Sequence, residues 1–185
     1  DRKPGEAYVT MFTSFNPNAG KTFVIQNIAA SMALKGAKVL LVDLDLRKAT
    51  LSKALDKEHT GIAAYLNGKS ADYHAHVDRV SDNLFVLPVG TLPPNPTELL
   101  LTGRFGEMMA SLRQEYDYIF IDCPPIEVVA DAAIITKHTD MTVFVVRSGL
   151  LDKRSLPRIK ALYESAKYSR MALIVNGIDV EGRRS

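Results

Sequence analysis

The sequence predicts an α/β fold built on a doubly wound, mostly parallel sheet with helices on both faces. Short continuous apolar runs recur along the chain, and such runs are typical of strands buried on both sides of a sheet. Segments with apolar residues at helical spacing separate these runs. Alternating strands and helices favour parallel pairing through right-handed crossovers.

The first part of the chain supplies two strands and one long helix. Residues 8–13 are rich in β-branched and aromatic side chains, which favours a strand. Residues 22–35 place apolar side chains at helical spacing, and Gly36 supplies a stop signal. Residues 39–42 form a continuous apolar run and predict a buried strand. The pattern is weaker in residues 49–82, where we expect short helices and loops.

The middle of the chain contains a third strand and a proline-rich loop. Residues 84–87 are again continuously apolar, whereas the prolines between residues 88 and 96 resist regular structure. Asn95, Pro96 and Glu98 then match the N-cap, first and third positions of a new helix.

The remaining elements follow from the same two patterns. In chain order they are a helix at 104–115, a strand at 118–121, a helix at 126–137, a strand at 141–146, a helix at 155–167 and a strand at 172–175. In the last helix we expect an inward face, formed by Ile159, Leu162, Tyr163 and Ala166.

Length and composition fit a single domain over residues 1–185. A net charge of only +2 gives no polybasic argument for nucleic acid as a partner. The one cysteine, Cys123, excludes an internal disulfide and any multi-cysteine metal site. No run of about 18 nearly uncharged apolar residues predicts a membrane span. Because the chain opens at Asp1, we expect it to be a soluble fragment of a longer chain or a processed product.

The strongest chemical signal is the segment Ser14–Thr22, which lies between the first strand and the first long helix. Backbone N–H groups at a helix N-terminus attract phosphate, and Gly20 lets the backbone approach it closely. Lys21 supplies a charge for the β and γ oxygens, and Thr22 a hydroxyl for Mg²⁺. The strict P-loop pattern fails at its first position, Phe15, so an ordinary turn with an incidental Gly-Lys-Thr is the alternative.

Three carboxylates follow apolar strands. Asp43 and Asp45 come after the second strand, and their spacing of two predicts that both face the same way. Asp122 ends the strand at 118–121. Open α/β sheets bind ligands at this edge, so together with the loop these residues predict a site for a triphosphate, Mg²⁺ and an acidic group, in a fold of the P-loop NTPase type.

These pieces resemble the cytoplasmic catalytic domain of the bacterial tyrosine kinases, in the deviant P-loop ATPase superfamily. The matching segments are the P-loop at 14–22, a Walker A′ segment at 43–47, a Walker B strand at 118–125 and the proline-rich element Leu92–Leu100. The resemblance extends from about Tyr8 to Asp179. The related partition and cell-division ATPases carry a signature lysine where this chain has Asn16, which disfavours that branch.

The resemblance implies a transferase, an ATP- and Mg²⁺-dependent protein-tyrosine kinase that autophosphorylates in trans. It implies five catalytic side chains, namely Lys21, Asp43, Asp45, Arg47 and Asp122. The implied phosphate-binding residues are Asn18, Ala19, Gly20, Lys21, Thr22 and Phe23, and the implied metal ligands are Thr22, Asp43, Asp45 and Asp122, the carboxylates acting mostly through water.

Individual roles are less sharply defined. A tyrosine hydroxyl with a pKa near 10 benefits from a base, and either Asp43 or Asp45 is the candidate. Arg47 is expected to neutralise developing phosphoryl charge, and Asn176 to contact adenine. Cys123 is expected to be a buried packing residue, as are Tyr163 and Tyr168. Tyr65 and Tyr73 are only slightly better candidates for phosphoacceptors, and we do not expect either to be phosphorylated.

The resemblance also implies partners and a cellular role. It implies a homo-oligomer, with a ring as one arrangement, at the cytoplasmic side of the membrane. It also implies a membrane-embedded chain-length or activator protein or domain, and a cognate tyrosine phosphatase. The role is control of capsular or extracellular polysaccharide synthesis and export. The family's tyrosine-rich tail and its ring-forming helix before the first strand are both missing from this sequence. Two alternatives therefore remain, an ATPase that gates assembly of a membrane partner without tyrosine transfer, and a non-catalytic nucleotide-binding module.

Overall fold

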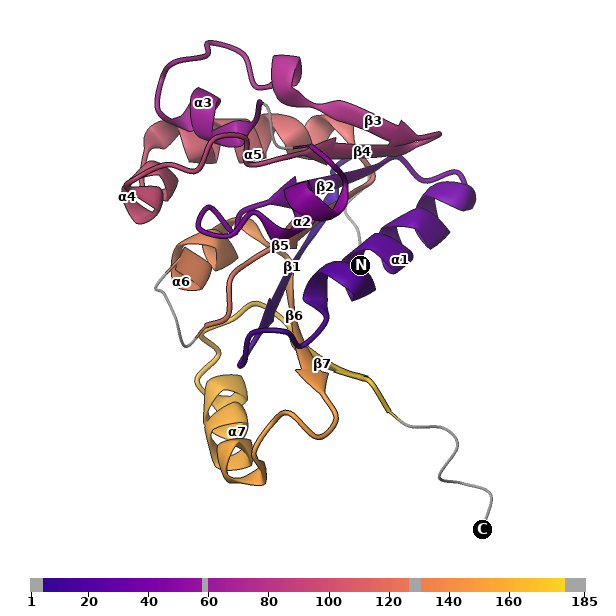
Figure 1. The fold of residues 1–185 in the computed structure, drawn as a ribbon, viewed down its shortest axis with the longest axis vertical. Helices are drawn as coiled ribbons and strands as arrows, with labels where there is room; N and C mark the ends of the chain where they lie inside the picture. Colours follow the sequence, from indigo (N-terminus) through magenta and orange to yellow (C-terminus); the bar gives the residue numbers. More distant parts are fainter. Residues whose placement is uncertain (1–4, 58–59, 127–130, 179–185) are drawn as a thin grey trace.

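The computed structural model describes residues 5–57, 60–126 and 131–178, and they build one seven-stranded sheet (Figure 1). The strand order is β3-β4-β2-β5-β1-β6-β7, and every pairing is parallel except that of β3 with β4. The strands are β1 (Tyr8–Ser14), β2 (Val39–Asp43), β3 (Asp78–Ser81), β4 (Leu84–Leu87), β5 (Tyr118–Asp122), β6 (Met141–Arg147) and β7 (Met171–Asn176). The predicted doubly wound, mostly parallel sheet is confirmed.

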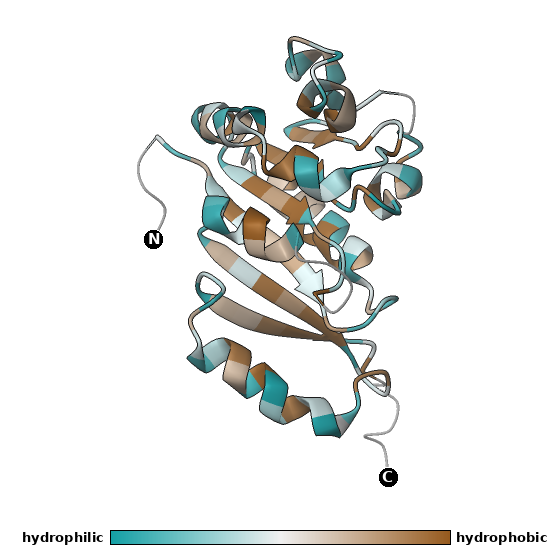
Figure 2. Ribbon diagram, turned by 90° about the vertical axis from the view of Figure 1, so that its left-hand side faces the viewer, coloured by the Kyte–Doolittle hydropathy of each residue, from teal (hydrophilic) through white to brown (hydrophobic). Residues whose placement is uncertain are grey.

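Helices cover both faces of this sheet. The helices are α1 (Lys21–Leu34), α2 (Thr50–Ala54), α3 (Ile62–Leu66), α4 (Pro96–Leu100), α5 (Gly103–Glu115), α6 (Asp131–Ile135) and α7 (Leu156–Glu164), with 3-10 turns at His74–His76, Thr136–His138 and Lys153–Ser155. One apolar cluster packs α1 and α2 against one face of the sheet. A second cluster packs the helices from α3 through α7 against the opposite face. The central strands are among the most hydrophobic segments in Figure 2, as expected for strands enclosed between two helical layers.

Two local expectations were wrong. Strand β3 was not predicted. Only one of its residues is half-buried and the others are exposed, so its sequence contains no apolar run. In α7 only Ile159 is buried and Leu162 is half-buried, whereas Tyr163 is 66 % exposed and Ala166 lies exposed beyond the helix. An edge helix over an edge strand has less sheet to cover, so its inward face is narrower than the pattern suggests.

The start of α4 has the predicted residues in the predicted positions. Asn95 is the N-cap, Pro96 is the first helical residue and Glu98 lies in the first turn, but the Asn95 side chain accepts no hydrogen bond from the helix backbone. Its amide instead donates to the Glu98 carboxylate, with 2.7 Å between Nδ2 and Oε2. The predicted helix at 126–137 is described from Asp131 onwards, and residues 127–130 lie outside the described residues.

The sheet brings the predicted chemical residues to one edge. Strands β1, β2 and β5 are parallel neighbours, and Asp43 is the register partner of Asp122. The carboxyl ends of these strands therefore meet next to the start of α1, which is the ligand-binding edge of such folds. Among the helices of the described residues, none is long and apolar enough to cross a membrane.

Candidate active site

The loop between β1 and α1 has the backbone of an anion-binding turn. Gly20 precedes α1 with φ of 88°, and Asn18 is also left-handed with φ of 61°. The left-handed backbone angle favours glycine at position 20, and a β-carbon there would also displace the side-chain amide of Asn176 from the loop. The Ser14 hydroxyl, at 2.7 Å from the Asn16 carbonyl oxygen, donates to it and shapes the turn without the missing first glycine of the motif. The loop thus aims the N-terminus of a long helix at the sheet edge.

Thr22 and Asp122 are in direct contact. The Thr22 hydroxyl donates to Asp122 Oδ2 at 2.7 Å, although the residues are 100 positions apart. The other carboxylate oxygen, Oδ1, is buried and has no hydrogen-bond partner among the described residues. Burial raises the pKa of Asp122 to about 6, and the nearby Lys21 charge opposes that rise.

This pair fits a magnesium ion. A buried carboxylate oxygen without a donor is rare in proteins, and an unfilled acceptor beside a threonine hydroxyl suits a hard cation. Within the described residues, no group of three or more His, Cys, Asp or Glu side chains could hold a metal by itself. Mg²⁺ does not require such a cage, because it keeps several waters and binds through one or two carboxylates together with substrate phosphates.

The two aspartates after β2 have different surroundings. Asp43 is fully buried, and its Oδ2 accepts bonds from the Ser52 backbone N–H at 2.8 Å and the Ser52 hydroxyl at 2.7 Å. Its Oδ1 accepts the Asp45 backbone N–H at 3.1 Å. Burial, together with the charge of Asp122, raises the pKa of Asp43 to about 7. In this geometry Asp43 faces α2, whereas Asp45 faces the pocket, so the expectation that both point the same way was wrong.

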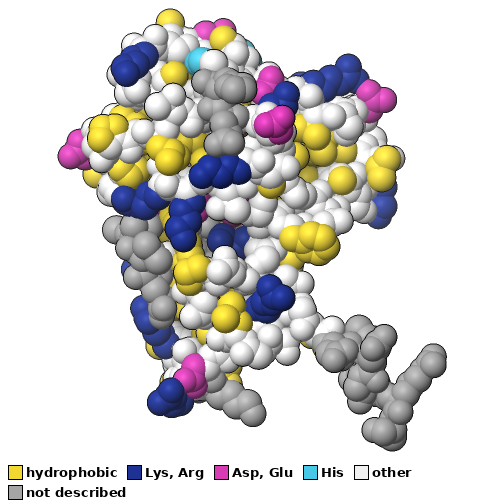
Figure 3. Space-filling model, in the orientation of Figure 1, with side chains coloured by type: hydrophobic (Ala, Val, Ile, Leu, Met, Phe, Trp, Pro, Cys, Tyr) yellow, Lys and Arg dark blue, Asp and Glu magenta, His cyan; other side chains and the backbone are white. Residues whose placement is uncertain are grey.

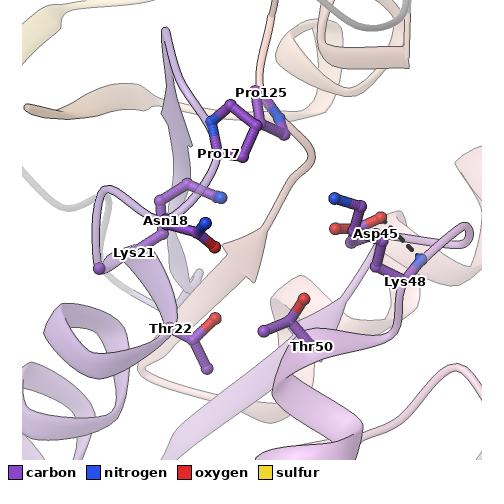
Figure 4. A pocket seen from close by; sticks show the side chains of 9 residues that line it. Pro17, Asn18, Lys21, Thr22, Asp45, Lys48, Thr50 and Pro125 are labelled. Carbon is purple, nitrogen blue, oxygen red and sulfur yellow. Dashed lines mark hydrogen bonds between the residues drawn. The ribbon is translucent and has the colours of Figure 1, made fainter. Parts of the chain in front are cut away.

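A pocket of about 220 Å³ lies between the P-loop and the segment after β2 (Figure 4). Gly20, Lys21 and Thr22 line it from one side, and Asp45 lines it from the other. The remaining lining residues are Pro17, Asn18, Lys48, Thr50 and Pro125. Two of the predicted phosphate-binding residues, Ala19 and Phe23, do not line the pocket. The Ala19 side chain is buried, and the Phe23 side chain is 65 % exposed.

Sequence reasoning missed Lys48 and Thr50. Lys48 follows the predicted Arg47, and Thr50 opens α2. The available signal was their position just after a strand that ends in an acidic pair, but neither residue belongs to a motif. On the face shown in Figure 3, Lys and Arg side chains are spread over several parts of the surface, with Asp and Glu side chains between them. The pocket itself is lined by two cationic side chains, Lys21 and Lys48, and by one carboxylate, that of Asp45.

Arg47 is not among the residues that line the pocket. Its guanidinium donates to the Thr97 hydroxyl at 3.0 Å and lies 3.4 Å from the carboxylate of Asp131. Asp131 is fully buried, and its second oxygen accepts the Thr97 hydroxyl at 2.6 Å. The structure therefore brings Lys21, Thr22, Asp45 and Asp122 together but places Arg47 against α4 and α6.

Asn176 lies where the sequence suggested, at the end of β7 beside the P-loop. Its side-chain amide donates to the Ala19 carbonyl oxygen at 3.1 Å, and its own Oδ1 accepts the Gly177 N–H at 2.8 Å. The contact with Ala19 connects the edge strand to the loop. Its contact with adenine remains a prediction.

The structure also tests the expectations for the cysteine and the tyrosines. Cys123 is fully buried, and burial raises the pKa of its thiol well above the ordinary value, which fits a packing residue. Tyr65 and Tyr73 are both buried, at 7 % and 6 % exposure, so neither hydroxyl lies on an exposed side chain, in line with the low expectation for both as acceptors. Tyr168 is buried as predicted, whereas Tyr163 is exposed and is not a packing residue.

Comparison with known proteins agrees with this geometry. A family model described as an AAA domain matches residues 13–165. The tyrosine-protein kinase CpsD of Streptococcus pneumoniae is 38 % identical over 175 residues, which cover 93 % of this chain and 77 % of CpsD. The kinase domain of the Escherichia coli tyrosine kinase ETK superposes with a TM-score of 0.88 at 28 % identity, covering 99 % of this chain and 72 % of that one.

A more distant likeness extends the fold to other ATPases. The septum site-determining protein MinD of Pyrococcus horikoshii, solved with Mg-ADP, has a TM-score of 0.74 at 22 % identity, covering 95 % of this chain and 75 % of that one. At this identity the likeness concerns the fold alone. On the family match, the sequence identity and the site geometry together, the chain belongs to the bacterial tyrosine kinases.

Proposed function

We propose that the pocket between the P-loop and the segment after β2 binds Mg-ATP and transfers its terminal phosphoryl group to tyrosine hydroxyls of other copies of the chain. The observation that supports this most directly is the contact of Thr22 with Asp122 at 2.7 Å, with the second Asp122 oxygen unpartnered. A P-loop hydroxyl and a Walker B carboxylate hold Mg²⁺ in this way in nucleotide enzymes.

The residues of the P-loop bind and orient the nucleotide in this proposal. The backbone of 18–23 and the Lys21 ammonium bind phosphate oxygens at the N-terminus of α1, where the helix dipole favours an anion. Thr22 and Asp122 hold the magnesium ion, which neutralises charge on the phosphates when bound. Asn176 contacts the adenine side of the loop in this proposal.

For the base, the geometry favours Asp45. Its side chain lines the pocket, so a tyrosine hydroxyl that approaches the terminal phosphate can reach it. Asp43 has a pKa near neutrality, but Ser52 and the Asp45 backbone surround its carboxylate. We infer that Asp43 holds the loop in place and that any contact of Asp43 with the metal is made through water.

The structure also narrows the choice of acceptor. All seven tyrosines lie in the described residues, and Tyr163 is the exposed one, while the others are buried or half-buried. Phosphate on this segment is therefore expected at Tyr163. Acceptors elsewhere would lie in chain outside this sequence.

The wider role is proposed from the family. We expect a homo-oligomer that phosphorylates in trans, a membrane-embedded activator, location at the cytoplasmic side of the membrane, and reversal by a tyrosine phosphatase. Control of capsular or extracellular polysaccharide synthesis and export follows from the same relationship.

Mass spectrometry tests the chemistry. The longest natural chain that contains this domain is treated with phosphatase, incubated with Mg-ATP and mapped for phosphotyrosine, beside Lys21→Met and the matched surface variant Lys35→Met. New phosphotyrosine in the original chain and in Lys35→Met, but not in Lys21→Met, supports the proposal. ATP hydrolysis without phosphotyrosine, even with the membrane partner added, would favour an assembly ATPase.

A further inference from the structure

Two adjacent cations after β2 lie in opposite surroundings. Arg47 turns toward α4 and α6, where Thr97 and Asp131 bind its guanidinium at 3.0 and 3.4 Å. Lys48 lines the nucleotide pocket, on the wall opposite Lys21 (Figure 4). The chain therefore presents Lys48, and not Arg47, to whatever occupies the pocket.

The position of Lys48 is fixed by its own backbone. Its N–H donates to the Asp45 side chain at 3.1 Å and to the Asp45 carbonyl oxygen at 3.2 Å. The next residue, Ala49, adopts a left-handed conformation with φ of 50° and also donates to the Asp45 carbonyl oxygen, at 2.8 Å. This turn sets the direction from which the lysine side chain leaves the backbone.

Within the part of the chain that the structure describes, the ammonium group of Lys48 has no carboxylate partner. None of the salt bridges there includes Lys48, although seven other Lys, Arg or His side chains have acidic partners. A lysine that lines a pocket and has no counter-ion within it is available to an anionic ligand. The bound anion would complete its electrostatic surroundings.

We propose that Lys48 is a nucleotide-binding residue that contacts the terminal phosphate of ATP from the side opposite the P-loop. This rests on the proposed function, because it takes ATP as the occupant of the pocket. A P-loop backbone cradles the inner phosphates, while its lysine reaches the β and γ positions. The terminal phosphate therefore projects away from α1, toward the wall formed by Asp45 and Lys48.

This placement makes Lys48 a residue that distinguishes a triphosphate from a diphosphate. Lys21 reaches the β-phosphate, which ATP and ADP share, as well as the γ-phosphate, so its loss should weaken the binding of both nucleotides. Lys48 contacts only the phosphate that ADP lacks, so its loss should weaken ATP selectively. In the same position it also helps to orient the phosphoryl group that is transferred.

Binding of ATP and ADP by the full chain, measured by calorimetry in the presence of Mg²⁺, tests the proposal. Lys48→Met should weaken ATP binding at least about tenfold while changing ADP binding by less than about threefold. Lys53→Met, on the exposed surface of the neighbouring α2, is the matched control and should change neither. Lys48→Arg should restore part of the ATP preference, because it keeps the charge.

The outcomes separate this proposal from the one on which it rests. An equal loss of ATP and ADP affinity, or no loss of either, would overturn the role of Lys48. So would unchanged ATP binding with a raised KM for a tyrosine peptide, because Lys48 would then contact the acceptor. If Lys21→Met also left ATP and ADP binding unchanged, the assignment of the whole pocket to a nucleotide would fail instead.

Discussion

Removal of the Ser52 hydroxyl tests how the acidic segment after β2 is held. Ser52 is fully buried on α2 and makes two hydrogen bonds through its side chain. Its hydroxyl donates to the Asp43 carboxylate at 2.7 Å and accepts the Val89 backbone N–H at 2.9 Å. Ser52→Ala removes both bonds while the backbone N–H of residue 52 still reaches Asp43, at 2.8 Å.

The expected loss follows from these two contacts. A hydrogen bond to a charged group contributes about 1.5–3 kcal/mol, and a buried donor left unpaired costs about 1–3 kcal/mol. Asp43 keeps two backbone donors, and Val89 N–H loses its acceptor in a fully buried position. We expect the free energy of unfolding to fall by roughly 3 kcal/mol, which lowers the Tm by roughly 6–12 °C for a domain of this size.

Urea unfolding followed by circular dichroism measures this loss. Ser31→Ala is the control, because Ser31 is exposed on α1 and the same atom is removed from a solvated position. That variant should change the unfolding free energy by less than about 0.5 kcal/mol. If Ser52→Ala were as stable as Ser31→Ala, the Asp43–Ser52–Val89 chain of hydrogen bonds would not hold the segment, and the assignment of Asp43 to a structural role would fail.

Two further predictions concern the same region. Gly61→Ala should lower the unfolding free energy by about 3 kcal/mol, because its new methyl group would overlap the backbone of Pro88 and Val89. Gly103→Ala is the control in the same urea experiment. It should be near neutral, because the space around Gly103 is open. In EDTA the native pKa of Asp43, about 7, lies above its unfolded value of about 3.9, so the folded state holds the extra proton and the unfolding free energy falls as pH rises between these values. Burial raises the pKa of Asp122 to about 6, so Asp122 adds a slope of the same sign below pH 6, and Asp43 dominates between pH 6 and pH 7 with up to about 1.4 kcal/mol per pH unit. Asp43→Asn should therefore flatten the slope between pH 6 and pH 7, and an unchanged slope there would show that another group titrates.

Much of the fold was predictable because the central strands are buried on both faces. Such strands appear in the sequence as continuous apolar runs, and those at the second, fourth and fifth strand positions were predicted to within one residue of their observed ends. The edge strand β3 gave no such signal, because its side chains lie mostly in solvent. The width of the buried face of α7 was overestimated for a related reason. A pattern of apolar residues does not show how much sheet surface is available to bury those residues.

The site was predictable only where a strand fixes the direction of the chain. Thr22 and Asp122 follow from the start of α1 and the end of β5, and the structure joins them. The expectation for Asp43 and Asp45 used the alternation of side chains in a strand, but β2 ends at Asp43. Asp45 lies in a turn held by its own carboxylate, so the alternation does not apply to it. Lys48 could not be placed for the same reason.

The first turn of α4, which lies in the proline-rich element Leu92–Leu100, gains a physical role from these contacts. Thr97 and Asp131 bind Arg47 on the side of the turn that faces away from the pocket. Asp43 and Ser52 hold the preceding residues to α2. With both flanks held, Asp45 and Lys48 project toward the P-loop from a turn that has little freedom to move. The wall opposite the P-loop is thus organised before a nucleotide binds, and preorganisation of this kind lowers the entropy lost when a phosphate is positioned for transfer.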